Sequence, residues 1–582
     1  MIYTLDPQTM VSLREVALGR EMADLVIVGG DVVNVYSGEI IQDQSIAIKG
    51  KWIAYVGPNV DHCTGANTER IDASGRVVIP GFIDGHTHLL YYCSPGEFLR
   101  YAMKGGTTTI ITELVDVSFA FQYQGLIELL EGLKDQPIKV FATVSPCMTL
   151  SEGFRKRSPN LEELIELLKR DDVVGVGEGY WQDTLRGDPN FPALSAEALR
   201  LRKTVEGHAA GCREKRLNAY LSYGVSSCHE STNPHEVIEK VRAGIWVMIR
   251  EGSVRKELHA MSELKKKDIG YRRLVLVTDS VDPCDLIEKG YMEFVVQRAI
   301  DLGFDPITAI QMATLNPAEH FRLDNLLGGI APGKYADIVI IHDLENIDAE
   351  YVISNGQVIS HNKEITAEPR KMKLSVGGFQ RREMAPDDFK IVVRGNQPCK
   401  VAVIDQITEL VTREAVMEMS TTSGEICCDP EKDILKISLI TWEGKVFTGL
   451  IRGLGMKKGA LATSYVWEGF GVIVAGENEE DMAFAVNRVF ELRGGIAVYS
   501  GGEILTELAL PIGGMISDLP LEALKDRLEE IESITKRLGF RFDHPLLTLS
   551  TITTPAIPFL RISEHGLVDL RTGSVVELIK NQ

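Results

Sequence analysis

Cysteine is scarce in this sequence and occurs in no paired motif. Nine cysteines are scattered along 582 residues, an odd number, and no C-x-x-C pair is present. A disulfide framework usually shows an even number of cysteines at regular spacings, and a thiolate zinc site needs paired ones. The cysteine content therefore excludes both and indicates reduced thiols in a cytoplasmic protein.

Basic residues and long apolar runs are also in short supply. The 62 Lys and Arg residues against 82 Asp and Glu residues give a net charge of −20. Nonspecific binding to nucleic acid or to an anionic membrane needs a basic patch, so we expect neither partner. No apolar run approaches the roughly 20 residues that span a bilayer, and the first 25 residues lack the apolar segment of a secretory signal. The 44% apolar content is that of a globular enzyme.

The length predicts roughly three or four folding units, and the pattern along the chain divides accordingly. Residues 24–80 and the segment after Pro332 alternate β-branched residues with turn residues, as strands in hairpins do. Between them, short apolar runs alternate with helical ones about eight times, which predicts βα units. The predicted fold class is α/β, with a (β/α)₈ TIM-like barrel at 81–324, a small β-sandwich domain built from both flanks (1–80 with 325–384), and a C-terminal α+β domain at 385–582.

Two histidines follow the first apolar run of the predicted barrel. His86 and His88 come directly after VVIPGFIDG. Residues i and i+2 of a strand point to the same side, so both imidazoles should face the mouth of the barrel. Reactive groups of such barrels lie at the C-terminal ends of the strands, and paired histidines suit a divalent transition metal. A single HxH pair is a weak signal, because such pairs also occur by chance.

Further metal-capable side chains occupy other predicted strand ends: Glu178 in DDVVGVGEGYW, His208 in TVEGHAAG, His229 in LNAYLSYGVSSCHE and Asp279 in RRLVLVTDS. Taken singly, each has an ordinary alternative, such as a loop histidine, an exposed carboxylate or, for Asp279, the N-cap of the next helix. Their coincidence at successive strand ends is improbable by chance. The sequence therefore predicts a metal site made by His86, His88, Glu178, His208, His229 and Asp279.

Three charged residues near these strand ends are candidates for other roles. Glu230 adjoins His229 and is either a proton-transfer or ligand-supporting residue, or a turn carboxylate before STNP. Arg250 and Glu251 lie where the seventh strand should end. They are predicted either to bind the substrate or to form a structural ion pair.

Longer phrases extend the pattern over almost the whole chain. PGFIDGHTH and the TD pair resemble the amidohydrolase superfamily of metal-dependent hydrolases. EGHAAG, WVMIREGS, ATLNPAEHF and GGIAPGKYADIVII are more narrowly similar to the adenine deaminase family, as are MKKGALATS, RGGIAVYSGGEILTELALPIGGMISD and PLLTLSTITTPAIP nearer the C-terminus.

The resemblance implies a binuclear centre and a reaction. His86, His88 and Asp279 would hold one divalent ion, His208 and His229 the other, and Glu178 would bridge them. Manganese is the usual metal that the family implies, with iron or zinc as alternatives. The implied reaction is hydrolytic deamination of adenine to hypoxanthine and ammonia by a metal-bound hydroxide, with Asp279 as general base and then acid. A small-molecule purine substrate and a homo-oligomer are also implied.

The chain departs from the family pattern at several places. Ser280 and Val281 replace an expected Asp and Arg, Leu89–Tyr92 replaces a polar phrase, and Glu113 and Asp116 are the only carboxylates where an Asp-Pro-His-Glu phrase is expected. In the C-terminal domain, residues 465–470 (YVWEGF) replace a His-Asp-x-x-His-Asn segment. An apolar pocket discriminates less well than a polar one. The departures therefore leave two alternatives open: deamination of an N6-substituted adenine or other purine-like amine, or aromatic substitutions that are inert core packing. Cyclic-amide C–N hydrolysis on the same scaffold and a non-catalytic scaffold are separate alternatives.

Overall fold

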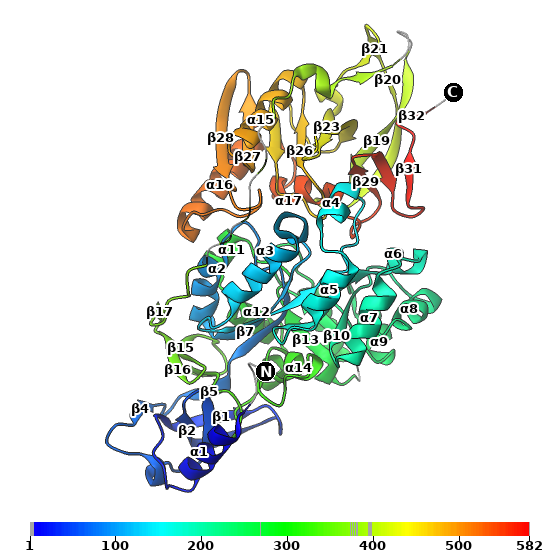
Figure 1. Ribbon diagram of the computed structural model, residues 1–582. Coiled ribbons are helices and arrows are strands. Elements are labelled where there is room, and N and C mark those ends of the chain that lie inside the picture. Colours follow the sequence, from blue (N-terminus) through cyan, green and yellow to red (C-terminus); the bar gives the residue numbers. More distant parts are fainter. Residues whose placement is uncertain are drawn as a thin grey trace.

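The computed structural model describes residues 5–580 except 268, 373, 375, 377–378, 380–381 and 394–397. Its parts follow one another along a single long direction (Figure 1). The barrel lies in the middle, a β-sheet that contains the N-terminal strands lies at one end, and the C-terminal unit lies at the other end (Figure 1). None of the helices in the described ranges is long and apolar enough to cross a membrane.

Eight parallel strands in chain order form the TIM-like barrel. They are β6 (Phe82–Thr87), β7 (Thr107–Glu113), β8 (Lys139–Val144), β9 (Val173–Tyr180), β10 (Thr204–His208), β11 (Ser227–Cys228), β12 (Trp246–Arg250) and β13 (Leu274–Val277). β6 to β10 form one parallel sheet and β11 to β13 another. The backbone N–H of Ser226 donates to Val205 (2.8 Å), and that of His88 donates to Asp279 (2.8 Å). These two bonds join the sheets at both seams and close the barrel.

Helices connect the strands as expected for βα units. They are α2 (Pro95–Ala102), α3 (Ser118–Leu133), α4 (Glu152–Arg157), α5 (Leu161–Leu168), α6 (Trp181–Arg186), α7 (Phe191–Arg200), α8 (Glu214–Leu221), α9 (Pro234–Arg242), α10 (Leu258–Met261), α11 (Pro283–Glu288), α12 (Met292–Asp301), α13 (Pro306–Met312) and α14 (Leu315–His320). The sixth strand differs from its predicted extent. LNAYL belongs to α8, where Leu217 and Tyr220 are buried at helical spacing, and only Ser227–Cys228 form the strand.

Strands from both flanks of the barrel share one nine-stranded sheet. They are β1 (Leu25–Asn34), β2 (Glu39–Lys49), β3 (Trp52–Gly57), β4 (Glu69–Asp72), β5 (Val77–Pro80), β14 (Ile338–Ile341), β15 (Ala349–Ser354), β16 (Gln357–His361) and β17 (Glu364–Ile365). The flanks meet where β5 pairs antiparallel with β14. Helix α1 (Pro7–Ala17) buries Leu13 and Val16 in the apolar cluster that contains Trp52 of β3.

A second nine-stranded sheet organises the C-terminal unit. Its strands are β19 (Cys399–Gln406), β20 (Thr412–Met419), β23 (Ile434–Ile440), β24 (Val446–Arg452), β25 (Ala460–Thr463), β26 (Val472–Gly476), β27 (Gly495–Ser500), β28 (Glu503–Ala509) and β32 (Ile579–Lys580). Short sheets accompany it: β18 (Ile391–Val392) with β21 (Thr421–Thr422) and β22 (Glu425–Ile426), and β29 (Leu560–Ser563) with β30 (Gly566–Asp569) and β31 (Ser574–Val576). Its longer helices are α15 (Glu479–Glu491), α16 (Leu521–Arg537) and α17 (Pro545–Ser550).

The C-terminal unit packs on the barrel at the end where the strands finish. The backbone N–H of Ser517 donates to the carbonyl of Tyr92 (2.8 Å), just past β6. The Ser151 hydroxyl, past β8, donates to Glu564 Oε1 (3.0 Å). Side chains from residues about 550 onward therefore reach the loops that surround the mouth of the barrel.

Candidate metal centre

The six side chains predicted as metal ligands come together at the mouth of the barrel. His86 lies in β6 and His88 follows it, Glu178 lies near the end of β9, and His208 is the last residue of β10. His229 directly follows β11, and Asp279 lies two residues beyond β13. All six are buried, because the strand ends converge beneath the C-terminal unit. Asp279 does not cap the next helix, since Asp282 is the N-cap of α11.

Glu178 lies at the centre of the cluster. Its Oε1 is 3.1 Å from His229 Nε2, 3.2 Å from His86 Nε2 and 3.6 Å from His88 Nε2. Asp279 Oδ1 is 3.4 Å from His86 Nε2 and 3.5 Å from His88 Nε2. The ligand atoms fall into two groups, each with all atoms within 4.8 Å: His86, His88, Glu178 and Asp279 form one, and Glu178, His208 and His229 form the other.

The donor set and its spacing fit divalent metal ions. Ligand atoms bonded to one ion at about 2.0–2.1 Å lie roughly 3 Å apart, which is close to the distances around Glu178. Among the described residues, the buried His86 Nε2 has no hydrogen-bond partner, so it is free to ligate. Imidazole and carboxylate donors suit first-row divalent metals. Glu178 belongs to both groups, so its carboxylate can contact two ions.

Asp116 holds one of the histidines in position. The His88 Nδ1 is 2.5 Å from Asp116 Oδ2, and both groups are buried. A carboxylate behind a ligand histidine fixes its tautomer and directs the other ring nitrogen toward the metal. His86 lacks an equally close partner, since its Nδ1 is 3.7 Å from Glu113 Oε1. Burial and the nearby Glu178 charge raise the pKa of Glu113 to about 7.

Glu230 and Arg250 form a buried charge network beside the cluster. Arg250 Nη1 contacts Glu230 Oε1 and donates to Asp279 Oδ2 (3.1 Å), while Nη2 donates to Glu257 Oε1 (2.9 Å). Burial opposes ionisation of Glu230, but the Arg250 guanidinium holds its pKa well below its usual range. Glu230 Oε1 is also 3.3 Å from His208 Nε2. Arg250 thus binds three carboxylates of the chain at the edge of the metal cluster.

Glu251 lies outside this cluster. It lines a separate surface cavity with Lys289 and Arg298, and its Oε2 accepts from the backbone N–H of Leu258 (3.1 Å). Neighbouring residues of a strand point to opposite faces, so Arg250 and Glu251 diverge. Of the two predicted substrate-binding residues, the structure therefore brings only Arg250 to the centre.

Several residues that sequence reasoning did not assign to the site line the same cavity. They are Tyr180, Val254, Arg255, Trp467, Glu468, Ala556 and Ile557. Tyr180 had a local signal, because it lies two residues after Glu178 on one strand and therefore on the same face. Trp467 and Glu468 belong to the segment that departs from the family pattern. Nothing in the sequence brings that segment to the barrel, because more than 280 residues separate Glu468 from Tyr180.

The departures at residues 89–92 lie in the interface between barrel and C-terminal unit. Leu89, Leu90, Tyr91 and Tyr92 are buried in the main hydrophobic core. The Tyr91 and Tyr92 rings lie 5.5 and 4.4 Å from that of Tyr465. These residues pack the two units together and do not line the metal cavity.

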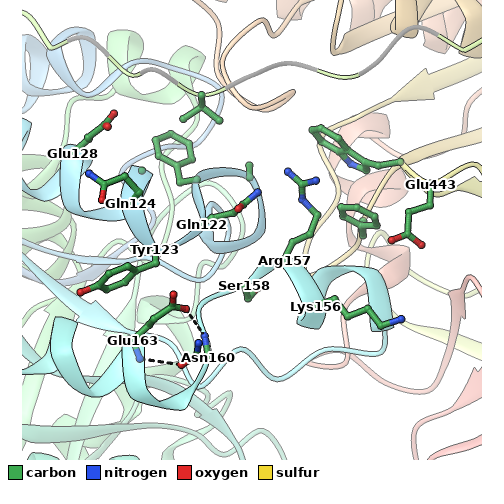
Figure 2. A pocket seen from close by; sticks show the side chains of 16 residues that line it. Gln122, Tyr123, Gln124, Glu128, Lys156, Arg157, Ser158, Asn160, Glu163 and Glu443 are labelled. Carbon is green, nitrogen blue, oxygen red and sulfur yellow. Dashed lines mark hydrogen bonds between the residues drawn. The ribbon is translucent and has the colours of Figure 1, made fainter.

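A larger cavity of about 950 Å³ opens on the far side of the same C-terminal segment. Figure 2 shows Tyr123 and Gln124 of the barrel on one side of it and Glu443 of the C-terminal unit on the other. The Arg157 guanidinium lies over the rings of Trp442 (5.4 Å) and Phe470 (5.7 Å). Segment 465–470 therefore lies between the two cavities, since Phe470 lines the larger one.

The barrel and its buried histidine–carboxylate cluster define a metal-dependent hydrolase of the amidohydrolase class, and the sequence model of the amidohydrolase family matches residues 77–362. A second model, the adenine deaminase C-terminal domain, matches residues 409–574. The chain belongs to the adenine deaminase family. It is 33% identical to an adenine deaminase of Clostridium botulinum over 97% of both chains. It is 34% identical to that of Dehalococcoides mccartyi over 98% of this chain and 99% of the other.

Proposed function

We propose that this chain hydrolyses adenine to hypoxanthine and ammonia. The observation that carries the proposal is the gathering of four imidazoles and the Asp279 carboxylate around Glu178 at the mouth of the barrel. The relatives named adenine deaminase, which match nearly the full chain, support adenine as the substrate. Adenine also satisfies the chemistry of the site, because its C6 carries an amine that hydrolysis can release.

The residues present suit two divalent ions, and we take Mn²⁺ as the native metal. His86, His88 and Asp279 would hold one ion, His208 and His229 the other, and Glu178 would contact both. When bound, such an ion acts as a Lewis acid and lowers the pKa of water toward neutrality. The chain's own side chains then orient the substrate and move its protons.

Asp279 is the residue placed to move the proton. Its Oδ1 faces His86 and His88, and its Oδ2 accepts from Arg250 Nη1 (3.1 Å). Burial opposes ionisation of Asp279, but the hydrogen bonds with His86 and His88 and the Arg250 charge hold its pKa well below its usual range. The ionised carboxylate can therefore accept a proton from the attacking water. The water oxygen then bonds to C6, the C6–N6 bond breaks, and the proton passes from Asp279 to the departing amine.

Substrate entry requires a wall of the site to move. The cavity beside the ligands measures about 30 Å³, which is room for water but not for a purine ring. Pockets for ring-shaped ligands are typically at least about 300 Å³. The wall that must move includes Arg255 of the barrel and Trp467, Glu468 and Ile557 of the C-terminal unit.

The proposal includes three further features of the protein. Nine free cysteines, five of them buried, support a reducing cytoplasmic setting. The acidic net charge of −20 supports small-molecule binding without nucleic acid or membrane partners, and homo-oligomerisation follows the family. We also propose residues 1–80 with 325–384 as a β-sandwich domain, 81–324 as the catalytic barrel and 385–582 as the C-terminal α+β domain, supported by the pairing of β5 with β14.

Ammonia release from adenine by the protein reconstituted with Mn²⁺ under anaerobic conditions tests the function directly. We expect steady release that the Asp279→Asn variant loses by at least about 100-fold, while hypoxanthine accumulates in equal amount. Two bound metal ions per chain without any ammonia release would overturn the proposal for adenine. Cyclic amides would then be the next substrates to assay.

A further inference from the structure

Two adjacent residues of the C-terminal unit line the metal cavity, and each carries a buried polar side-chain atom. Trp467 and Glu468 line it together with His88, Glu178 and Asp279. Their backbone is held by the barrel and by their own unit. The Thr149 hydroxyl donates to the backbone carbonyl of Glu468, and the backbone N–H of Trp467 donates to the backbone carbonyl of Ser550 (3.0 Å). The pair is thus held in place through its backbone while its side chains face the site.

The Glu468 side chain has one oxygen engaged and one oxygen open. Tyr180 donates its hydroxyl to Glu468 Oε1 (2.8 Å), and the same hydroxyl is 3.4 Å from Glu178 Oε2. Glu468 Oε2 is buried and accepts no hydrogen bond from the described residues. Burial, the largest influence, raises the pKa of Glu468 to about 7, although the Thr554 and Tyr180 hydroxyls lower it. A buried acceptor without a partner costs free energy, so it needs a reason to be retained.

The backbone conformation of Glu468 also indicates a functional role for this residue. Its φ is +44°, in the left-handed region that residues with a side chain rarely adopt. Such residues concentrate at functional sites, where surrounding contacts hold them in place. Here the held conformation is the one that directs the carboxyl group into the cavity.

Trp467 supplies the complementary open donor. Its indole Nε1 is buried and, within the described part of the chain, donates no hydrogen bond. Its ring is roughly parallel to that of His88, with centroids 6.0 Å apart. A flat heterocycle bound beside the ligands would therefore meet an N–H donor and a carboxyl acceptor from consecutive residues.

The other acidic groups of the cavity wall are already engaged. Glu230 and Asp279 pair with Arg250, and Glu178 lies among three histidines. Tyr180 donates to Glu468. Apart from His86 Nε2, which faces the metal position, Trp467 Nε1 and Glu468 Oε2 are the buried polar side-chain atoms of this wall that lack a partner among the described residues.

We propose that Trp467 and Glu468 are the substrate-recognition pair of this enzyme. Glu468 accepts a hydrogen bond from the exocyclic amine of the purine, and Trp467 donates one to the neighbouring ring nitrogen. The Tyr180 hydroxyl links Glu468 to Glu178, so the pair lies next to the metal ligands and therefore next to C6 of a bound adenine. The exocyclic amine is bonded to C6 and lies close to both N1 and N7. This inference rests on the proposed adenine deamination and assigns its specificity to the C-terminal unit of the same chain.

Two conservative variants and a matched control test the pair. Glu468→Gln keeps an acceptor for Tyr180 but replaces the open oxygen by an NH₂ donor, and Trp467→Phe removes only the indole N–H. Glu564→Gln is the control, because Glu564 is another buried carboxyl group that contacts the barrel, at Ser151, without lining the metal cavity. We expect kcat/KM for adenine to fall about 10-fold or more in the first two variants and to change less than about twofold in the control, with metal content unchanged.

Competitive inhibitors separate recognition from a structural role. Glu468→Gln should weaken inhibition by 7-deazaadenine, which keeps the amine, and leave inhibition by purine, which lacks it, unchanged. Trp467→Phe should weaken inhibition by only one of 1-deazaadenine and 7-deazaadenine, namely the one that retains the contacted nitrogen. Equal effects on both members of either pair, or no effect, would overturn the assignment.

Failure of the proposed function would look different. If wild-type protein with two metals bound releases no ammonia from adenine, the reaction is wrong. The recognition pair is then tested by calorimetric binding of the same analogues to the wild type and the two variants. The pair is supported if the variants lose affinity selectively, as above, and overturned if wild type and variants bind the analogues alike.

Discussion

Asp116 and Glu113 provide a sharp test of the metal centre. Both are buried carboxyl groups behind a predicted ligand histidine. Glu113 is the last residue of β7, and Asp116 lies three residues further along the chain. The structure separates them by distance: Asp116 Oδ2 is 2.5 Å from His88 Nδ1, whereas Glu113 Oε1 is 3.7 Å from His86 Nδ1. The first is a hydrogen bond and the second is too long to be one.

The isosteric substitutions should therefore have unequal effects. A carboxylate that supports a ligand histidine typically contributes 10–100-fold to metal affinity or activity. We expect Asp116→Asn to weaken metal binding about 10-fold, which corresponds to about 1.4 kcal/mol. Glu113→Gln should change it less than about threefold, because no bond to His86 is lost.

Competition for Mn²⁺ against a chelator of known affinity measures both variants on one scale. Activity titrated against free metal concentration gives the same order by an independent readout. Circular dichroism of the metal-free proteins checks that both variants fold. Equal losses in the two variants, or unchanged chelator resistance in Asp116→Asn, would refute the assignment of Asp116 as the support of His88.

Three further predictions concern stability and geometry. Lys139→Met should lower the free energy of unfolding in urea by about 3–5 kcal/mol, because the Asp337 carboxylate, 2.7 Å from Lys139 Nζ, stays buried without its cation. Adding Asp337→Asn should restore part of this stability. Additive losses in the double variant would contradict the prediction. Gly252→Ala should lower kcat at least about 10-fold, because its Cβ would lie 2.1 Å from the carbonyl oxygen of Thr278, the residue before the proposed catalytic Asp279. An unchanged kcat would contradict this. Burial raises the pKa of Glu293 to about 7, so the stability that its protonation contributes is complete below about pH 4.5 and is lost as pH rises through 7. Glu293→Gln should therefore melt at a higher temperature than wild type at pH 8 and at the same temperature at about pH 4, and an equal difference at both pH values would refute this.

The sequence was most informative where chemistry coincides with strand ends. His86 and His88 share a face because they are two residues apart on an extended chain, and strand ends of a parallel barrel meet in space. The same local rule explains why Glu251 does not lie at the metal cluster: it is adjacent to Arg250, so its side chain points to the opposite face and lines a separate cavity. Strand length was less predictable: β11 has two residues, too short for any periodic pattern.

The pocket wall could not be derived in this way. The substitutions at residues 89–92 were compatible with a wider apolar pocket or with core packing, and the structure places these side chains in the core of an interface. Glu468, by contrast, reaches the site from another unit of the chain. Sequence pattern reports which residues are apolar or polar, but not which distant surface they meet.

The amino-acid sequence by itself thus determined the βα order of the barrel, the six ligand candidates at its strand ends and the family to which the chain belongs. These depend on local periodicity and on residue type, both of which can be read one segment at a time. Only the tertiary structure decided that Glu178 lies among three imidazoles, that Arg250 binds three carboxylates, and that Trp467 and Glu468 close the site. Those arrangements arise from packing between segments hundreds of residues apart, where burial and distance, rather than sequence spacing, set the contacts.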